Sequence, residues 1–162
     1  MKKDKPKLFK KIIIHRSGDV DKTPYLERTF LMITPWFRVM WHKFLISDDD
    51  CLHDHPWAFL SFIVKGGYWE WCDYDQLSLK ERKKIDFTKI ERRLGSDGGL
   101  QIRRRYNPGS ILFRRADWKH KVEVDKPAYT LVITFKKERR WGFWPKRGWV
   151  HHSEYGSTAK CE

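Results

Sequence analysis

The chain has 162 residues, and its 34 Lys and Arg against 21 Asp and Glu give a formal net charge of +13. This length suits one domain, and 40% hydrophobic residues, with 15% aromatic, are enough to fill a core, which argues against wholesale disorder. The longest apolar runs are far shorter than the ~20 residues that a membrane span needs. No signal-peptide core follows the basic start. We therefore expect a cytoplasmic protein with no membrane segment.

The positive charge is dispersed along the chain and is not gathered in a known nucleic-acid-binding motif. No helix-turn-helix, zinc-finger or RNP-type pattern accompanies it. We interpret it as a solvated basic surface that attracts anions, and nucleic acid is the less favoured partner.

The three cysteines, Cys51, Cys72 and Cys161, are odd in number and have no repeating spacing. This pattern predicts free thiols, not a disulfide scaffold or a zinc knuckle. Cys51 and Cys72 are expected to be buried structural thiols.

In chain order, the hydrophobic pattern is mostly that of short strands separated by Gly, Pro and Asp turns. After a disordered N-terminal tail (1–7), strands are expected at 8–15, 29–34, 37–46, 58–65, 68–73, 100–106, 111–114, 119–124 and 129–135. Turns are expected at 17–19, 35–36, 47–50, 66–67, 96–99 and 107–109. Such a pattern indicates a sandwich or barrel. It gives one domain over 8–155 and a C-terminal tail over 156–162.

Two segments depart from this pattern. Residues 77–93 fit either a short helix or a strand. The aromatic-rich stretch 140–150 is expected to form a lid or flap over one side of the core, or else an edge strand.

Two histidines separated by one residue carry the clearest chemical signal. On a strand, His53 and His55 point to the same face, so their ring nitrogens can hold one ion. His120 is the natural third ligand, because it begins an alternating apolar strand and should face the core. Three neutral imidazoles suit Fe(II), Zn, Ni, Cu or Mn, with open positions for water or substrate. Asp54 points to the opposite side, where we expect a supporting or surface role.

The spacing around the histidine pair resembles the first motif of the cupin superfamily. That motif runs Gly, five residues, His-x-His, three or four residues, Glu, six residues, Gly. Here Ser47 takes the first position, and Gly66 or Gly67 the last. The position of the motif Glu is filled by Phe59 or Leu60, neither of which can bind a metal.

The second cupin motif runs Gly, five residues, Pro-x-Gly, two residues, His, three residues, Asn. The chain matches its spacing from Gly109 through His120 to Val124, although the Pro, the second Gly and the Asn are absent. The two motifs together span 47–124. With its His-Asp-His-Pro-Trp and Trp-Gly-Phe segments, the chain is similar to small cupins of phages and prophages, which would place it in the host cytoplasm.

The resemblance implies an all-β fold, a single antiparallel jelly-roll barrel with metal in its mouth. Here the barrel would carry a short helical or irregular insertion and an aromatic C-terminal flap. It also implies a metal-dependent enzyme that acts on a small anionic molecule. The first expectation is Fe(II) with oxygenase-like chemistry. The second is isomerisation or epimerisation of a phosphosugar. The alternative of a different kind is a non-catalytic binding module or sensor, which could associate with nucleic acid. The sequence assigns no catalytic residue.

The missing motif carboxylate makes Glu70 the residue that would separate a four-ligand site from a three-histidine site. It shares a strand face with Tyr68, and we expect both in the cavity wall or behind the ligands, with a solvent-facing position as the alternative for Glu70. Arg104 and Arg114 are candidate anchors for an anionic substrate, unless they are salt-bridged or solvated. We also expect a homodimer, because paired subunits commonly cover exposed strands and surplus aromatic surface.

Overall fold

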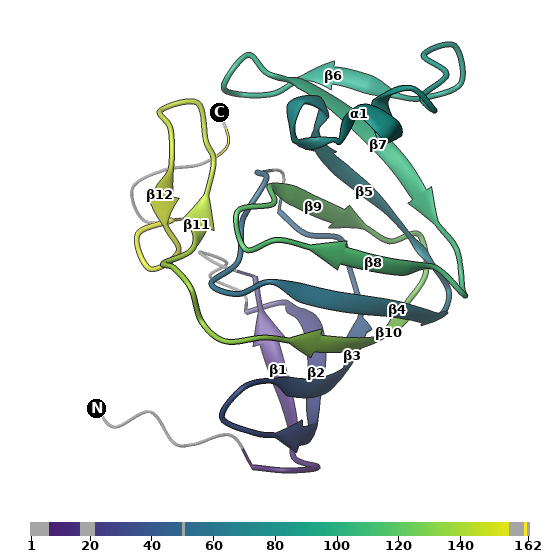
Figure 1. Cartoon of the computed structure of the whole chain (residues 1–162). Helices are drawn as coiled ribbons and strands as arrows, with labels where there is room; N and C mark the ends of the chain where they lie inside the picture. Colours follow the sequence, from purple (N-terminus) through teal and green to yellow (C-terminus); the bar gives the residue numbers. More distant parts are fainter. Residues whose placement is uncertain (1–6, 17–21, 50, 156–160, 162) are drawn as a thin grey trace.

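The computed structural model describes residues 7–16, 22–49, 51–155 and 161, and nearly all of its regular structure is antiparallel β-sheet (Figure 1). Six strands form one sheet in the order β1-β2-β3-β10-β4-β8, and four form a second sheet in the order β6-β7-β5-β9. The first sheet contains β1 (Lys11–His15), β2 (Pro24–Ile33), β3 (Arg38–Phe44), β4 (Phe59–Lys65), β8 (Ile111–Arg114) and β10 (Ala128–Thr134). The second contains β5 (Tyr68–Asp73), β6 (Arg92–Leu94), β7 (Leu100–Tyr106) and β9 (His120–Glu123).

The remaining elements lie outside the two large sheets. The C-terminal hairpin of β11 (Gly142–Phe143) and β12 (Val150–His151) stands at one side of the barrel, and the turn η1 (Tyr74–Gln76) and the helix α1 (Leu79–Arg82) lie near β6 (Figure 1). No helix among the described residues has the length and apolar character that crossing a membrane requires.

The two sheets pack face to face, because alternate residues of their strands turn inward. One core cluster joins Ile63 and Ala128 of the first sheet to Tyr68 and Val122 of the second. Along β10 every second residue is buried, as the period of two in a strand requires. The result is the predicted all-β, single antiparallel jelly-roll barrel.

The hairpin between β4 and β5 depends on two glycines. Gly66 and Gly67 have φ of 84° and 80°, in the left-handed region that residues with a side chain rarely adopt. A Cβ at Gly66 would also lie 2.6 Å from the carbonyl oxygen of Pro127. This confirms the turn expected at 66–67 and places β4 and β5 in opposite sheets.

Several expected elements differ from the structure at their ends. β2 begins at Pro24, five residues before the expected strand, because pairing with β1 extends it. The ambiguous stretch 77–93 contains α1, whose first turn is closed by a capping box of Ser78 and Glu81, and β6 follows it from Arg92. The turn at 17–19, residues 1–6 of the expected N-terminal tail and nearly all of the C-terminal tail (156–160 and 162) lie outside the described residues. The domain boundaries remain predictions.

The expectation of free thiols is wrong for two of the three cysteines. Cys51 and Cys161, 110 residues apart in sequence, form a disulfide. Cys72 is free and buried, and burial raises the pKa of its thiol. The disulfide depends on the fold, which brings Cys161 against the segment that precedes the histidine pair, and no local spacing signals such a contact.

Candidate metal centre

The two histidines of the pair lie on a short extended segment beside β9, outside any named strand. His53 exchanges both backbone hydrogen bonds with His120, at N···O distances of 2.8 and 3.0 Å. The backbone N–H of His55 donates to the carbonyl of Ala116 at 3.0 Å. These bonds hold the segment extended, so His53 and His55 turn to one side, as expected for strand residues.

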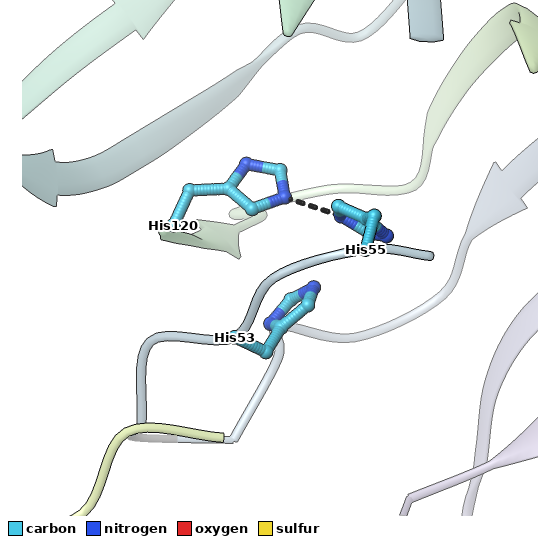
Figure 2. Close-up of side chains that lie close together, drawn as sticks. All are labelled: His53, His55 and His120. Carbon is cyan, nitrogen blue, oxygen red and sulfur yellow. Dashed lines mark hydrogen bonds between the residues drawn. The ribbon is translucent and has the colours of Figure 1, made fainter. Parts of the chain in front are cut away.

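The three imidazoles converge on one point inside the barrel (Figure 2). One ring nitrogen of each of His53, His55 and His120 lies within 4.8 Å of the others, and Nε2 of His55 is 2.8 Å from Nε2 of His120. Two nitrogens bound at about 2.1 Å to one ion are roughly 3 Å apart, so this spacing is close to that of a ligand set. Three nitrogen donors fit a divalent transition metal, with positions left open for other ligands.

Burial keeps two of these imidazoles, those of His53 and His55, uncharged near neutral pH. It lowers the pKa of His53 to about 4, against the opposing effect of Asp48, whose Oδ2 is 3.9 Å from Nδ1 of His53. Burial also lowers the pKa of His55 well below 6.5, and the neighbouring His53 and His120 add to this effect. Because a metal binds the neutral imidazole, protons on these two histidines would do little to oppose metal binding at pH 7.

Glu70 lies behind His120, on the side of the ring that faces away from His55. Its Oε1 accepts a hydrogen bond from Nδ1 of His120 at 2.8 Å. The carboxylate is 1% exposed, which excludes the solvent-facing alternative. By fixing the proton on Nδ1, it turns the lone pair of Nε2 toward the other two histidines.

Glu70 also forms a buried ion pair with Arg114. Nε of Arg114 is 3.0 Å from Oε1, and Nη2 is 2.5 Å from Oε2. Burial alone would raise the pKa of Glu70, but the charge of Arg114 and the hydrogen bond from His120 lower it below its usual range. The carboxylate is therefore ionised, and both of its oxygens are occupied.

The two arginines proposed as substrate anchors both have carboxylate partners. Arg114 pairs with Glu70 and stacks on Trp118, with its guanidinium carbon 4.3 Å from the ring centroid. Arg104 pairs with Glu81 of α1 at 3.3 Å. Neither is among the described residues that line the cavity of the three histidines. The salt-bridged alternative thus describes both.

The histidine cavity has a volume of about 80 Å³ and a mostly apolar wall. Tyr68 lines it, as the sequence suggested. Six further polar side chains of the wall were not predicted from the sequence, namely Tyr25, Arg28, His42, Asp48, Ser61 and Thr134. A signal for two of them exists, because Arg28 lies between Leu26 and Phe30 at the period of an inward strand face, and His42 lies between Met40 and Phe44 in the same way.

Asp54 turns away from the histidines and binds the C-terminal flap. Its side chain is completely buried, and it accepts hydrogen bonds from the backbone N–H of Gly142 at 2.8 Å and from Nε1 of Trp149 at 3.1 Å. Arg139 adds an ion pair at 3.2 Å. A surface position for Asp54 is therefore wrong, and its supporting role is to hold the flap.

The stretch 140–150 is a flap and not an edge strand of the barrel. It forms the hairpin of β11 and β12, and Phe143 bridges to the backbone of His53. The rings of Phe143 and His53 have centroids 5.8 Å apart. The flap thus covers the histidine nearest to it.

The sequence matches no protein-family model and no curated protein sequence. The structure is similar to the polyketide cyclase RemF from Streptomyces resistomycificus, at a TM-score of 0.54 and 13% identity over 99% of this chain and 96% of that one. It is also similar to Fe(II)-HppE with the alternative substrate (S)-1-HPP, at a TM-score of 0.50 and 15% identity over 82% and 60% of the two chains. The DMSP lyase DddQ from Ruegeria pomeroyi DSS-3 matches at a TM-score of 0.49 and 15% identity, over 76% and 53%.

These likenesses concern the fold, since all three identities are low. The chain spans about half the length of DddQ and 60% of the length of HppE. Proteins described as cupins are among the further matches. The chain shares its antiparallel jelly-roll fold with RemF, and a three-histidine cluster lies in its cavity.

Proposed function

We propose that this chain is a metal-dependent cupin enzyme that holds a divalent transition metal with His53, His55 and His120 and acts on a small anionic substrate. The observation that carries the proposal is the convergence of three buried imidazoles, two of them with a lowered pKa, in one cavity. Fe(II) with oxygenase-like chemistry is the first choice. The fold it shares with a protein described as Fe(II)-HppE supports that choice.

The metal, Glu70 and the apolar wall of the cavity would each contribute differently to such a site. A bound divalent metal supplies Lewis acidity, and a redox-active one adds electron transfer with dioxygen. Glu70 keeps the proton of His120 on Nδ1, so that Nε2 faces the ion. The apolar wall, which includes Phe59 and Val132, excludes water from the reacting atoms.

The alternative function, a nucleic-acid-binding module, has less support from the aromatic and basic side chains of the second sheet. Trp69 and Trp71 lie on β5, but the guanidinium of Arg103 already covers Trp69, at 4.4 Å from the ring centroid, and that of Arg93 covers Trp71, at 4.5 Å. Arg103 is also paired with two carboxylates of the chain. These aromatic and basic side chains therefore already contact one another or carboxylates of the chain. Nucleic-acid bases or phosphates could bind them only by breaking those contacts.

Elemental analysis of the purified protein tests the proposal. The protein is loaded separately with Fe(II), Co(II) or Ni(II) under anaerobic conditions and then desalted. We expect about one ion per chain in the wild type and its loss in the variants His55→Ala and His120→Ala. The double variant His151→Gln/His152→Gln is the control, because these two histidines lie in the flap, outside the cluster.

Two results would overturn the proposal. One is a wild type that retains none of the three metals at neutral pH. The other is a metal content that His55→Ala leaves unchanged in folded protein. For the oxygenase choice, the Fe(II) protein is expected to bind nitric oxide, a stand-in for dioxygen, and electron paramagnetic resonance would detect the product.

A further inference from the structure

A second polar pair faces the histidine cavity from the opposite sheet. Arg28 of β2 and His42 of β3 are direct cross-strand partners. Arg28 shares its strand face with Leu26 and Phe30, which are 3% and 6% exposed, so its side chain points into the barrel. Both members of the pair line the same cavity as the three histidines.

The hydrogen bond within the pair fixes how the guanidinium is presented. Nε of Arg28 donates to Nε2 of His42 at 2.9 Å. Nε2 must therefore be unprotonated, and burial, together with the charge of Arg28, lowers the pKa of His42 well below 6.5. His42 orients the guanidinium without neutralising it, and the two terminal nitrogens remain available for a ligand.

In the described part of the chain, no carboxylate pairs with this charge. Among the residues that the structure describes, none of the Asp and Glu side chains lies within 4.0 Å of the guanidinium nitrogens of Arg28. Asp48 lines the same cavity, but its Oδ2 accepts the backbone N–H of Val122 at 2.6 Å, and Tyr25 also hydrogen-bonds to it. A largely buried cation without a counter-ion is costly, and an anionic ligand would remove that cost.

One small molecule in the cavity could contact both Arg28 and the histidine cluster, because all four side chains line it. Its positive charge contributes to the lowered pKa of His55. The cavity volume of about 80 Å³ admits a ligand of only a few non-hydrogen atoms. A molecule with an acidic group at one end would fill the space between the guanidinium and the imidazoles.

We propose that Arg28, oriented by His42, binds the oxyanion group of the ligand, a carboxylate or a phosphate, and so sets the specificity of the cavity for small anions. The guanidinium offers two parallel N–H groups, which match two oxygens of such a group. Calling this ligand the substrate rests on the proposed function, whereas the binding of the anion does not.

Calorimetric titration of the protein with acetate, inorganic phosphate and the neutral acetamide tests the proposal. We expect the wild type to bind at least one of the two anions at least tenfold more tightly than acetamide. Arg28→Met should weaken that binding at least tenfold and leave the affinity for acetamide unchanged, because it removes charge-assisted hydrogen bonds and keeps an unbranched side chain that reaches about as far as Nε. Preference for acetate or for phosphate identifies the class of anion.

The control is Arg92→Met, which removes the same charge from the exposed start of β6 in the other sheet. It should change the anion affinity less than twofold, and so it separates a specific site from general attraction to a chain of charge +13. Thermal unfolding checks that each variant is folded. If Arg28→Met does not fold, Arg28→Lys replaces it, and we expect weaker anion binding there too because the fork of donors is lost.

An anion affinity that Arg28→Met leaves within twofold of the wild type would overturn the inference, as would a wild type that binds neither anion better than acetamide. Metal analysis of the same samples keeps the two proposals apart. Loss of anion binding in Arg28→Met without any metal in the wild type would uphold the anion site and refute the metal enzyme. Metal bound to the wild type, together with unchanged anion binding in Arg28→Met, would support the metal site and refute the anion site.

Discussion

Glu70 connects His120 to Arg114 in one buried polar network. The conservative change Glu70→Gln removes its charge and leaves the guanidinium of Arg114 buried without a counter-ion. We expect the free energy of unfolding to fall by about 3–5 kcal/mol. The metal affinity should fall about 10- to 100-fold, although saturating metal should still give nearly one ion per chain. Denaturant titration and metal titration measure the two effects.

Glu81→Gln is the matched control for that variant. Glu81 pairs with Arg104 near the surface, and such pairs contribute about 0–1 kcal/mol. If folded Glu70→Gln protein retains no metal even at saturation, Glu70 is itself a ligand and the three-histidine assignment is wrong.

His42 makes stability depend on pH in a predictable direction. Its pKa in the folded chain is well below 6.5, so below pH 6.5 the unfolded chain binds a proton that the folded chain does not. Stability is therefore full above pH 6.5 and falls as the pH drops, by up to about 1.4 kcal/mol per pH unit for each such histidine. His53 adds the same effect down to a pH of about 4.

We expect His42→Gln to show a shallower loss of stability between pH 7 and pH 5 than the wild type, in metal-free protein unfolded by denaturant. The exposed variant His15→Gln should keep the wild-type slope. Equal slopes for His42→Gln and the wild type would contradict the assignment of a neutral buried imidazole.

At the scale of elements, the C-terminal flap depends on Asp54. Asp54→Asn keeps the size of the side chain but loses the ion pair with Arg139, and it places an amide N–H₂ where the carboxylate accepts donors from the flap. We expect faster cleavage by trypsin at the exposed Lys146 and Arg147, and a loss of about 1.5–3 kcal/mol of stability. Limited proteolysis followed by mass spectrometry checks the first effect.

Asp117→Asn is the control for the flap, because the pair of Asp117 with Arg115 is exposed at the surface. Cleavage of Asp54→Asn at the wild-type rate would show that other contacts hold the flap.

Most strands could be predicted because alternation and turn residues are local signals. The stretch 68–73, bounded by Gly66 and Gly67, is observed with the expected ends, and so is 100–106. The start of β2 could not be predicted, because it depends on pairing with β1. The stretch 77–93 was ambiguous because helix formers and β-branched residues adjoin there, and the capping box decides a single turn of helix.

The site was predictable to the extent that its residues share short motifs. Strand alternation and the spacing of the two motifs predicted that His53, His55 and His120 lie together and that Asp54 points away from them. The partners of Arg104 and Arg114 could not be foreseen, because Glu81 and Glu70 meet them only through the three-dimensional fold. The position of Arg28 and His42 in the cavity wall was not predicted for a different reason. Each is a polar residue within an apolar strand, and neither belongs to a motif.

At the scale of the whole molecule, the neighbouring strands β4 and β8 carry exposed apolar side chains at the edge of the six-stranded sheet. Val64, Ile111 and Phe113 are 50%, 62% and 55% exposed on β4 and β8, and these strands lie side by side (Figure 1). Contiguous exposed apolar surface of this kind marks an interface. A second copy can cover it with the same patch through a twofold axis.

We therefore expect a homodimer in sedimentation velocity at micromolar concentration, and a monomer for the variant Phe113→Asp. Trp36→Asp is the control, because Trp36 is 72% exposed in the turn between β2 and β3, away from this patch. A wild type that sediments as a monomer would refute the expectation.

The tripeptide His53-Asp54-His55 serves two sides of the barrel at once. Its histidines face the cavity, and the aspartate between them binds the flap. The same stretch of backbone therefore positions both the metal-binding imidazoles and the carboxylate that holds the flap. If ion binding favours the backbone geometry in which Asp54 also binds the flap, then docking of the flap favours ion binding by the same free energy. Metal binding would then stabilise the docked hairpin of β11 and β12, and the mobility of the flap would indicate whether the site is occupied.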